Sequence, residues 1–263
     1  PRPGFGTRYT HSTMQGVIDS TGHYGWTQAS RVAVKVLDSY QAWQPLEHKR
    51  DDLESFLETY RSEKAEEGGT MTVVRDKVLA EAKRDLTTFF SSRSSVRDFS
   101  PEPVEMALIE ASIQDALKTP SVCNRQSWHV YVADNRKTID MSLAFQNGNR
   151  GFGETIDKLL IVAADLSGFL NARERVQPWI DGGLFSMSLV YALHSRGLGT
   201  CCLNMSTAPD TDRAMRRAIP IRPEHSVVMM IAVGHLRETY RVASSPRRSV
   251  AEVTTYLASP SDT

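Results

Sequence analysis

Residues 91–100 read SSRSSVRDFS and place Arg93 and Arg97 four positions apart among serines. Guanidinium and hydroxyl groups together suit a phosphate, because the guanidinium offers a planar fork of N–H donors and hydroxyls supply further hydrogen bonds. Arg93, Ser95 and Arg97 share one parity, so an extended backbone directs them to the same side. The alternative is the end of a solvated helix, where arginine favours the negative end of the helix dipole. Taken alone, these ten residues favour the helix end.

The composition of the chain limits the classes of protein to which it can belong. The chain has 263 residues, of which 40% are hydrophobic and 24% charged, with a formal net charge of zero. A chain with balanced charge has no overall positive potential to attract nucleic acid or an anionic membrane, so neither is expected as a partner. No apolar run approaches the ~20 residues of a membrane-spanning helix, and PRPGFGTRYTHST (1–13) lacks the apolar core of a signal peptide. Three cysteines without metal-ligand spacing indicate a reducing compartment, and we expect a cytoplasmic protein.

The chain shows no motif for side-chain catalysis. The seven histidines form no H-x-x-x-H or H-x-H set, so no metal site is expected. Cys201 and Cys202 are adjacent on a predicted strand, point to opposite faces and are interpreted as core residues. Cys123 has no His/Asp pair at recognisable spacing, which argues against a nucleophile.

Periodicity predicts a mixture of helices and strands, and hence an α+β or α/β class. Residues 1–24 have no sustained period and are interpreted as an extended arm, and RSEKAEEGG (61–69) is the best candidate boundary. The predicted helices span 27–46, 53–60, 71–91, 108–117 and 181–199. The predicted strands span 128–134, 158–165, 200–204 and 226–234.

A second informative stretch is TPSVCNRQSWHVYV (119–132). The amides of Asn124 and Gln126 present both donors and acceptors, which suits the edge of a heteroaromatic ring. The alternative is an ordinary helix-to-strand loop in which Trp128 anchors the core, and both interpretations stay open.

Four blocks in order resemble the FMN-dependent nitroreductase family. They are SSRSSVRDFSPEPV (91–104), TPSVCNRQSWHVYV (119–132), IDGGLFSMSLVYALHSRGLGTCCLN (180–204) with MMIAVGHL (229–236), and the basic tail SPRRSVAEVTTY (245–256). Each block alone is weak, whereas the ordered set covers about two-thirds of the chain. The resemblance implies a three-layer α/β/α sandwich with a mostly antiparallel central sheet. It also implies a domain boundary, with an N-terminal arm and helical extension at 1–85 and an FMN-binding domain at 86–263.

The resemblance also assigns roles. Arg93 and Ser95 would hold the FMN phosphate, and Arg97 would face the N1/O2 edge of the flavin. A loop from a second subunit would contact the flavin, so a homodimer is implied, and the small residues Gly182, Gly183, Ser186 and Ser188 would let the long helix pack across it. The full set of implied FMN-binding positions is Arg93, Ser94, Ser95, Arg97, Pro120, Ser121, Val122, Asn124, Gln126, Met205, Ser206, Arg247 and Arg248.

Three positions depart from the family pattern. Ser94 stands where many members have a second basic residue, Ser127 replaces a common proline before the tryptophan, and Val122 replaces a small residue.

The resemblance implies hydride transfer from NADH or NADPH through flavin N5 to an electron-poor acceptor such as a nitroaromatic or quinone, in alternate half-reactions. No catalytic side chain is then required, because the cofactor carries the chemistry. Two alternatives stay open. One is a specialised FMN enzyme of the same fold (a dehalogenase, a flavin-cleaving enzyme or a heterocycle oxidase), and the other is a flavin-binding dimeric interaction module with little turnover.

Overall fold

The computed structural model of the chain describes residues 6–65, 68–69, 85–243, 245 and 247–257. Contacts divide the chain into two units, Pro1–Arg84 and Asp85–Thr263. Within the described residues, every helix is too short or too polar to cross a bilayer.

The first unit is a small helical bundle. Its elements are α1 (Thr7–Tyr24), α2 (Gln28–Trp43) and α3 (Asp51–Tyr60), with short 3₁₀ turns η1 (Leu46–His48) and η2 (Arg61–Glu63). Thr27 and Ser30 form a reciprocal capping box that fixes the start of α2. The apolar faces of the helices meet in a core made of Val17, Val34, Leu37, Leu53, Phe56 and Leu57.

The interpretation of residues 1–24 as an extended arm is wrong, because residues 7–24 form α1. Its fully buried positions are Thr10 and Val17, with Met14 packed between them against the core. These positions recur at helical spacing, but one of the three is polar, so the apolar signal is weak in the sequence. Residues 71–84 of the predicted helix at 71–91 lie outside the described residues, and its described remainder overlaps α5 (Leu86–Ser92).

The second unit is built on a four-stranded antiparallel sheet in the order β1-β2-β4-β3. The strands are β1 (Trp128–Ala133), β2 (Lys158–Asp165), β3 (Leu198–Asn204) and β4 (His225–His235). All four predicted strands are confirmed. The long central strands β2 and β4 are buried on both faces, which explains their nearly continuous apolar sequences.

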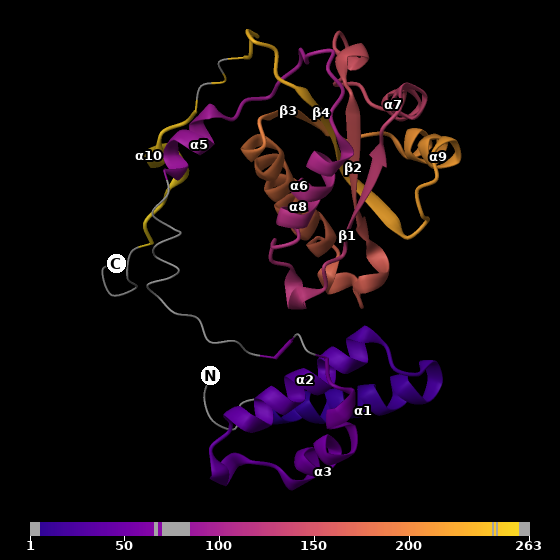
Figure 1. Ribbon diagram of the computed structural model, residues 1–263, viewed down its shortest axis with the longest axis vertical. Helices are drawn as coiled ribbons and strands as arrows, with labels where there is room; N and C mark the ends of the chain where they lie inside the picture. Colours follow the sequence, from indigo (N-terminus) through magenta and orange to yellow (C-terminus); the bar gives the residue numbers. More distant parts are fainter. Residues whose placement is uncertain (1–5, 66–67, 70–84, 244, 246, 258–263) are drawn as a thin grey trace. The chain divides into compact units, whose positions relative to one another are not determined.

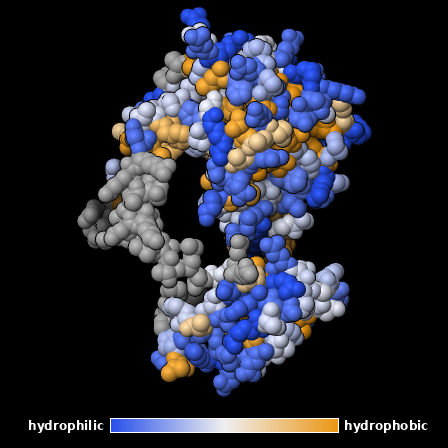
Figure 2. Space-filling view, viewed as in Figure 1, coloured by the Kyte–Doolittle hydropathy of each residue, from blue (hydrophilic) through white to orange (hydrophobic). Residues whose placement is uncertain are grey.

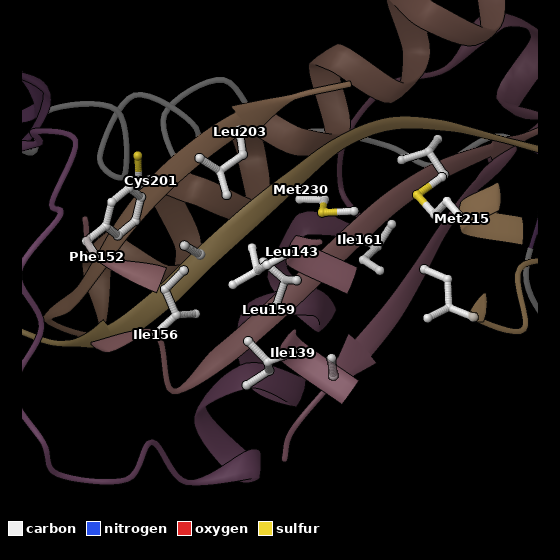
Figure 3. Close-up of a cluster of buried hydrophobic side chains, with 14 of the residues drawn as sticks. Ile139, Leu143, Phe152, Ile156, Leu159, Ile161, Cys201, Leu203, Met215 and Met230 are labelled. Atoms are coloured by element: carbon white, nitrogen blue, oxygen red, sulfur yellow. The ribbon is translucent and has the colours of Figure 1, made fainter. Parts of the chain in front are cut away.

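Helices cover both faces of this sheet, so the predicted three-layer α+β fold is confirmed (Figure 1). Helices α6 (Met106–Ala116) and α8 (Gln177–Ser195) pack on one face, against strand residues such as Leu160 and Ile231. Helices α7 (Arg136–Leu143) and α9 (Pro209–Ala218) cover the other face, against the alternate residues such as Leu159 and Met230. Figure 3 shows this second cluster. Short 3₁₀ turns η4 (Gly153–Thr155), η5 (Leu166–Gly168) and η6 (Ala172–Glu174) join the layers, and α10 (Val250–Val253) lies in the tail.

The small residues of α8 do not all face outward. Gly182 and Ser186 are buried, and a Cβ on Gly182 would lie 2.6 Å from Val228 Cγ2 of β4. The expectation that Gly182 and Ser186 pack across a subunit interface is therefore wrong, because both serve the close approach of α8 to its own sheet. Gly183 differs, since a Cβ there would meet nothing within 4 Å.

The stretch 93–100 is tied to the sheet beside β3 and β4. The amide of Val96 donates to the carbonyl of Thr200 (2.9 Å), and the amide of Ser100 donates to the carbonyl of His235 (2.9 Å). The ring of Phe99 is 1% exposed and lies over two strand glycines. A Cβ on Gly234 would lie 2.6 Å from Phe99 Cγ, and one on Gly199 would lie 3.3 Å from Phe99 Cε1.

We expect the substitution Gly234→Ala to lower the free energy of unfolding by about 1–3 kcal/mol, because the added methyl overlaps the buried ring of Phe99. Chemical denaturation of the full chain measures the change. Gly168→Ala is the matched control, since its methyl would meet only Ser127 Cβ at 3.9 Å. Equal stability of the two variants would contradict the proposed packing.

Candidate functional site

The two interpretations of SSRSSVRDFS describe successive parts of the same segment. Helix α5 ends at Ser92, and Arg93 is its C-cap residue with extended backbone angles (φ −74°, ψ 124°). Arg93 therefore follows the negative end of the helix dipole, as the helix-end interpretation requires. The chain then continues as a strand-like segment beside β3, where Ser95 forms a parallel bridge with Thr200.

A cavity of about 450 Å³ opens at this segment. Its charged lining consists of Arg93, Arg97 and Arg247, and Ser94 and Ser95 lie between the first two arginines. Neither Arg93 nor Arg97 forms an ion pair with a described residue, so two guanidinium groups face the cavity without a carboxylate partner. The remaining lining residues are Phe90, Ser91, Tyr191, Ala243 and Ser245. We call this hollow the arginine cavity.

Of the two tail arginines, Arg247 lines the arginine cavity and Arg248 does not. Arg247 Nη1 donates to the carbonyl of Ser245, whose φ of +40° marks a tight turn in the tail. The sequence alone does not show which of Arg247 and Arg248 lines the cavity.

An aromatic wall borders the arginine cavity, and the motif gives no sign of it. Phe90 meets Tyr191 edge to face, with ring centroids 4.9 Å apart. Beside them, Ser92 Oγ lies 2.9 Å from His194 Nε2. Burial and the nearby Arg93 lower the pKa of His194, so this imidazole is neutral at pH 7. Tyr191 and His194 both come from α8, a hundred residues away in sequence.

Cys201 packs in the core as expected, whereas Cys202 is exposed. Burial raises the pKa of the Cys201 thiol, although Arg97 and Arg93 act in the opposite direction. A protonated, buried thiol is a poor nucleophile. The structure thus gives the arginine cavity no thiolate.

The loop before β1 has an unusual backbone. Cys123, Asn124 and Gln126 all have positive φ, between 50° and 53°, in a region that non-glycine residues seldom adopt. Such strain persists only where surrounding contacts fix it, and it is frequent at functional sites. The exposed amides of Asn124 and Gln126 stand on this loop, which follows the exposed Pro120.

Two contacts hold the loop in this shape. Ser121 Oγ accepts a hydrogen bond from the amide of Gln126 (3.0 Å), which closes the loop on itself. Asp181 Oδ2 of α8 accepts from the amide of Val122 (3.2 Å), while its Oδ1 accepts from Gln177 Nε2 (2.8 Å). Asp181 is 1% exposed, so this carboxylate is a buried anchor for the loop. An acidic residue at the start of a predicted helix gives no hint of this role.

Within one chain, the loop lies far from the arginine cavity. Trp128 begins the edge strand β1 and aligns through Ala164 with Ser226, whereas Thr200 lies on the opposite edge strand and aligns with Val233. Trp128 and Thr200 are separated by seven residues along β4, at ~3.4 Å each, and by three strand spacings of ~4.8 Å across the sheet. The distance between them is therefore on the order of 25 Å. The structure therefore does not bring Asn124 and Gln126 to Arg93 in the same chain. Trp128 itself stacks on Phe185 (4.9 Å, 12°) and is a core anchor.

Met205 and Ser206 follow the end of β3. The amide of Ser206 donates to Asn204 Oδ1 (3.0 Å), and Met205 packs on the core. Neither residue lines the arginine cavity. They follow Thr200 by five and six residues, which is about 17–20 Å of extended chain along the edge of the sheet that β3 forms.

The described residues contain no group of three or more His, Cys, Asp or Glu side chains placed to hold a metal ion.

Comparison with known proteins gives one family. The nitroreductase family model matches residues 90–159 and 143–235, which together cover more than half of the chain. A relative from Methanothermobacter thermautotrophicus, provisionally named NADH dehydrogenase/NAD(P)H nitroreductase, is 25% identical over 148 residues. That alignment covers 56% of this chain and 74% of the relative.

Solved structures share the fold. A provisionally named nitroreductase of Desulfovibrio desulfuricans, solved in complex with FMN, superposes with a TM-score of 0.58 at 20% identity, over 68% of this chain and 99% of that one. The FMN-dependent nitroreductase of Clostridium difficile R20291 gives a TM-score of 0.52 at 19% identity, over 60% and 92% of the two chains.

We expect Asp181→Ala to release the loop, because the amide of Val122 loses its acceptor and an unsatisfied buried group costs about 1–3 kcal/mol. Hydrogen exchange measured by mass spectrometry should show faster exchange of a peptide covering 120–127. Asp181→Asn is the matched control, since an amide oxygen can still accept from Val122. Unchanged exchange in Asp181→Ala would contradict the anchoring role.

Proposed function

Because the chain belongs to the nitroreductase family, we propose that it is an FMN-dependent oxidoreductase. It would pass hydride from NADH or NADPH to an electron-poor acceptor such as a nitroaromatic or a quinone. The observation that carries the proposal is the arginine cavity, where Arg93 and Arg97 have no ion-pair partner among the described residues. The FMN complex of the similar Desulfovibrio structure supports the choice of cofactor.

The residues of the arginine cavity fit the phosphate of FMN. A phosphate dianion needs several donors and compensating charge, and Arg93, Ser94, Ser95 and Arg247 surround one hollow. Arginine is suited to this task because its planar fork binds two oxygens at once. We propose that Arg93 and Ser95 hold the phosphate with Arg247, and that the neighbouring Arg248 supports them from outside the lining.

The remaining proposed contacts would orient the flavin ring. Arg97 would place positive charge near the N1/O2 edge, and Met205 and Ser206 would contribute backbone N–H groups further along the edge of β3. When bound, FMN would supply the hydride transfer from NAD(P)H to the acceptor, so no acid or base from the protein is needed.

We propose that a homodimer completes the site, because a single chain keeps the loop and the arginine cavity apart. A second copy would bring Pro120, Ser121, Val122, Asn124 and Gln126 to the flavin held by the first. The exposed face of α8 supports this assembly, since Val176, Ile180, Leu184 and Met187 recur at helical spacing with 37–53% of their surface exposed. Figure 2 shows hydrophobic residues interrupting the hydrophilic surface of the face in view.

The proposed catalytic domain spans 86–263, and residues 1–85 form an extension without an assigned role. The cytoplasmic location expected from the cysteine content stays a prediction.

The proposal is tested by the colour and the reactivity of the purified chain. A yellow protein supports the oxidoreductase if it loses the visible absorbance of oxidised flavin on anaerobic addition of NADH or NADPH and regains that absorbance with a quinone. A yellow protein that neither nucleotide bleaches would instead favour the specialised enzyme or the binding module. A chain that cannot be loaded with FMN would overturn the assignment.

We expect Arg93→Ala to weaken FMN binding by about 10- to 150-fold, because a hydrogen bond to a charged group contributes about 1.5–3 kcal/mol. Flavin fluorescence titration measures the affinity. Arg150→Ala removes the same charge from an exposed loop that does not line the arginine cavity, so it should leave the affinity unchanged. Equal affinities of the two variants would show that Arg93 only ends a helix.

We expect Leu184→Glu to dissociate the dimer, because it introduces a charge into the exposed apolar face of α8. Light scattering coupled to size-exclusion chromatography measures the mass. Leu166→Glu is the control, since Leu166 is similarly exposed (44%) outside α8. The proposal requires FMN retention to fall together with the dimer, and a monomer that still holds FMN normally would refute a shared site.

A further inference from the structure

A second, smaller cavity lies behind the loop, at the start of β1. Its volume is about 180 Å³. Its lining comes from the loop, β1, the η5 turn and the start of β4, and comprises Arg125, Gln126, Ser127, Trp128, His129, Asp165, Ser167, Gly168, Arg222 and His225. We call it the histidine cavity. Apart from Gln126, its polar groups have no part in the proposed FMN site.

Three potential donors at the histidine cavity have no hydrogen-bond partner in the described part of the chain. The hydroxyl of Ser127 is buried and makes no hydrogen bond with a described residue. Among the hydrogen bonds and ion pairs of the described residues, none involves the His129 imidazole or the Arg222 guanidinium. Ser127 is the buried one of the three, whereas His129 is half-buried and Arg222 is exposed. A buried hydroxyl without a partner is rare in folded proteins and calls for an explanation. Ser127 also stands where the family pattern has proline, so this hydroxyl is a feature of this chain.

His225 has a fixed role in the wall. The amide of Arg222 donates to Tyr131 Oη (3.0 Å), and Tyr131 Oη lies within hydrogen-bonding distance of His225 Nδ1 (2.8 Å). On the other side of the ring, His225 Nε2 lies 3.9 Å from Asp165 Oδ2. These contacts orient His225, whose side chain is 2% exposed.

The formal charges at the histidine cavity balance. Arg125 is paired with Glu174 (2.8 Å), which leaves Arg222 as the free cation. Asp165 supplies the opposite charge, because the hydrogen bonds from Ser167 lower the pKa of this carboxyl and keep it ionised. An anion that enters the cavity therefore needs one more positive charge nearby.

His129 can supply that charge. Its ring lies 4.8 Å from His225 and 4.6 Å from Tyr131, centroid to centroid. Burial, followed by His225 and Arg222, lowers the pKa of His129, while Asp165 acts in the opposite direction. The imidazole is thus neutral at pH 7, and an anion placed beside it would favour its protonation.

We propose that the histidine cavity binds a small oxyanion together with one proton, which is taken up from solvent by His129. Arg222, the Ser127 hydroxyl and the protonated His129 are the donors for the oxyanion. The cavity volume lies below the ~300 Å³ of a typical organic ligand site. Sulfate, phosphate or a short carboxylate has the matching size. Because Arg125 and Gln126 belong to the same lining, the occupant lies directly behind the loop.

The test is isothermal titration of the full chain with sulfate, whose charge is constant from pH 6 to pH 8. Saturable binding should tighten as the pH falls, and buffers of different ionisation enthalpy should report proton uptake at pH 7. Arg222→Gln should weaken the binding at least about tenfold. His129→Gln should abolish the proton uptake and the pH dependence. A parallel titration with acetate distinguishes a carboxylate site from one selective for inorganic anions, and either outcome supports an oxyanion site.

Two controls separate this cavity from other positive charge. Arg217→Gln removes an exposed arginine of α9 that does not line the histidine cavity and should change nothing. Arg93→Ala removes a donor of the arginine cavity, so any binding that it abolishes belongs there. The proposal is overturned by absence of saturable binding, by equal effects of Arg222→Gln and Arg217→Gln, or by proton uptake that persists in His129→Gln.

Discussion

The packing of Phe99 over Gly234 and Gly199 is the constraint on which the candidate cofactor site depends. The ring of Phe99 fills the space that a Cβ atom at Gly234 of β4 or at Gly199 of β3 would need. With Phe99 in that place, the amides of Val96 and Ser100 reach the carbonyls of Thr200 and His235. An extended segment alternates its side chains, so burying Val96 sends its neighbours Ser95 and Arg97 away from the core. The hydrophobic contact of Phe99 thus places the side chains that line the arginine cavity.

The charge distribution shows why this cavity stands out in a chain without net charge. Several arginines elsewhere have carboxylate partners, such as Arg61 with Asp38 and Arg216 with Asp212. Surface pairs of this kind contribute little to stability, but they neutralise the local field. At the arginine cavity, Arg93 and Arg97 lack such partners among the described residues. A zero net charge therefore coexists with a local concentration of positive charge at the arginine cavity.

Helix α8 connects the separate parts of the second unit. One of its faces is buried against the sheet through residues such as Phe185 and Leu189, with Gly182 permitting the close approach to Val228. Its first turns anchor the strained loop through Asp181, and its last turns supply Tyr191 to the arginine cavity. The outward face carries the apolar residues that we assign to the dimer. A single helix therefore sets the positions of both halves of the proposed site.

The sequence by itself determined the fold class, the four strands and the family, because apolar alternation and ordered motifs are local properties of the chain. It also identified Arg93, Ser95, Arg97 and Arg247 as candidates for one site, and the structure places them around one cavity. It did not reveal α1, whose buried face includes a threonine, or the short polar helices α7 and α9.

Only the tertiary structure decided which distant residues meet. Asp181 reaches the loop, Tyr191 reaches the arginines, and Ser127 joins His129 and Arg222 around a second cavity. The tertiary structure likewise decided that Asn124 and Gln126 stand at the opposite edge of the sheet from Arg93. The physical reason is the same in each case. A motif records which groups are present, whereas strand order and helix packing determine the distances between them.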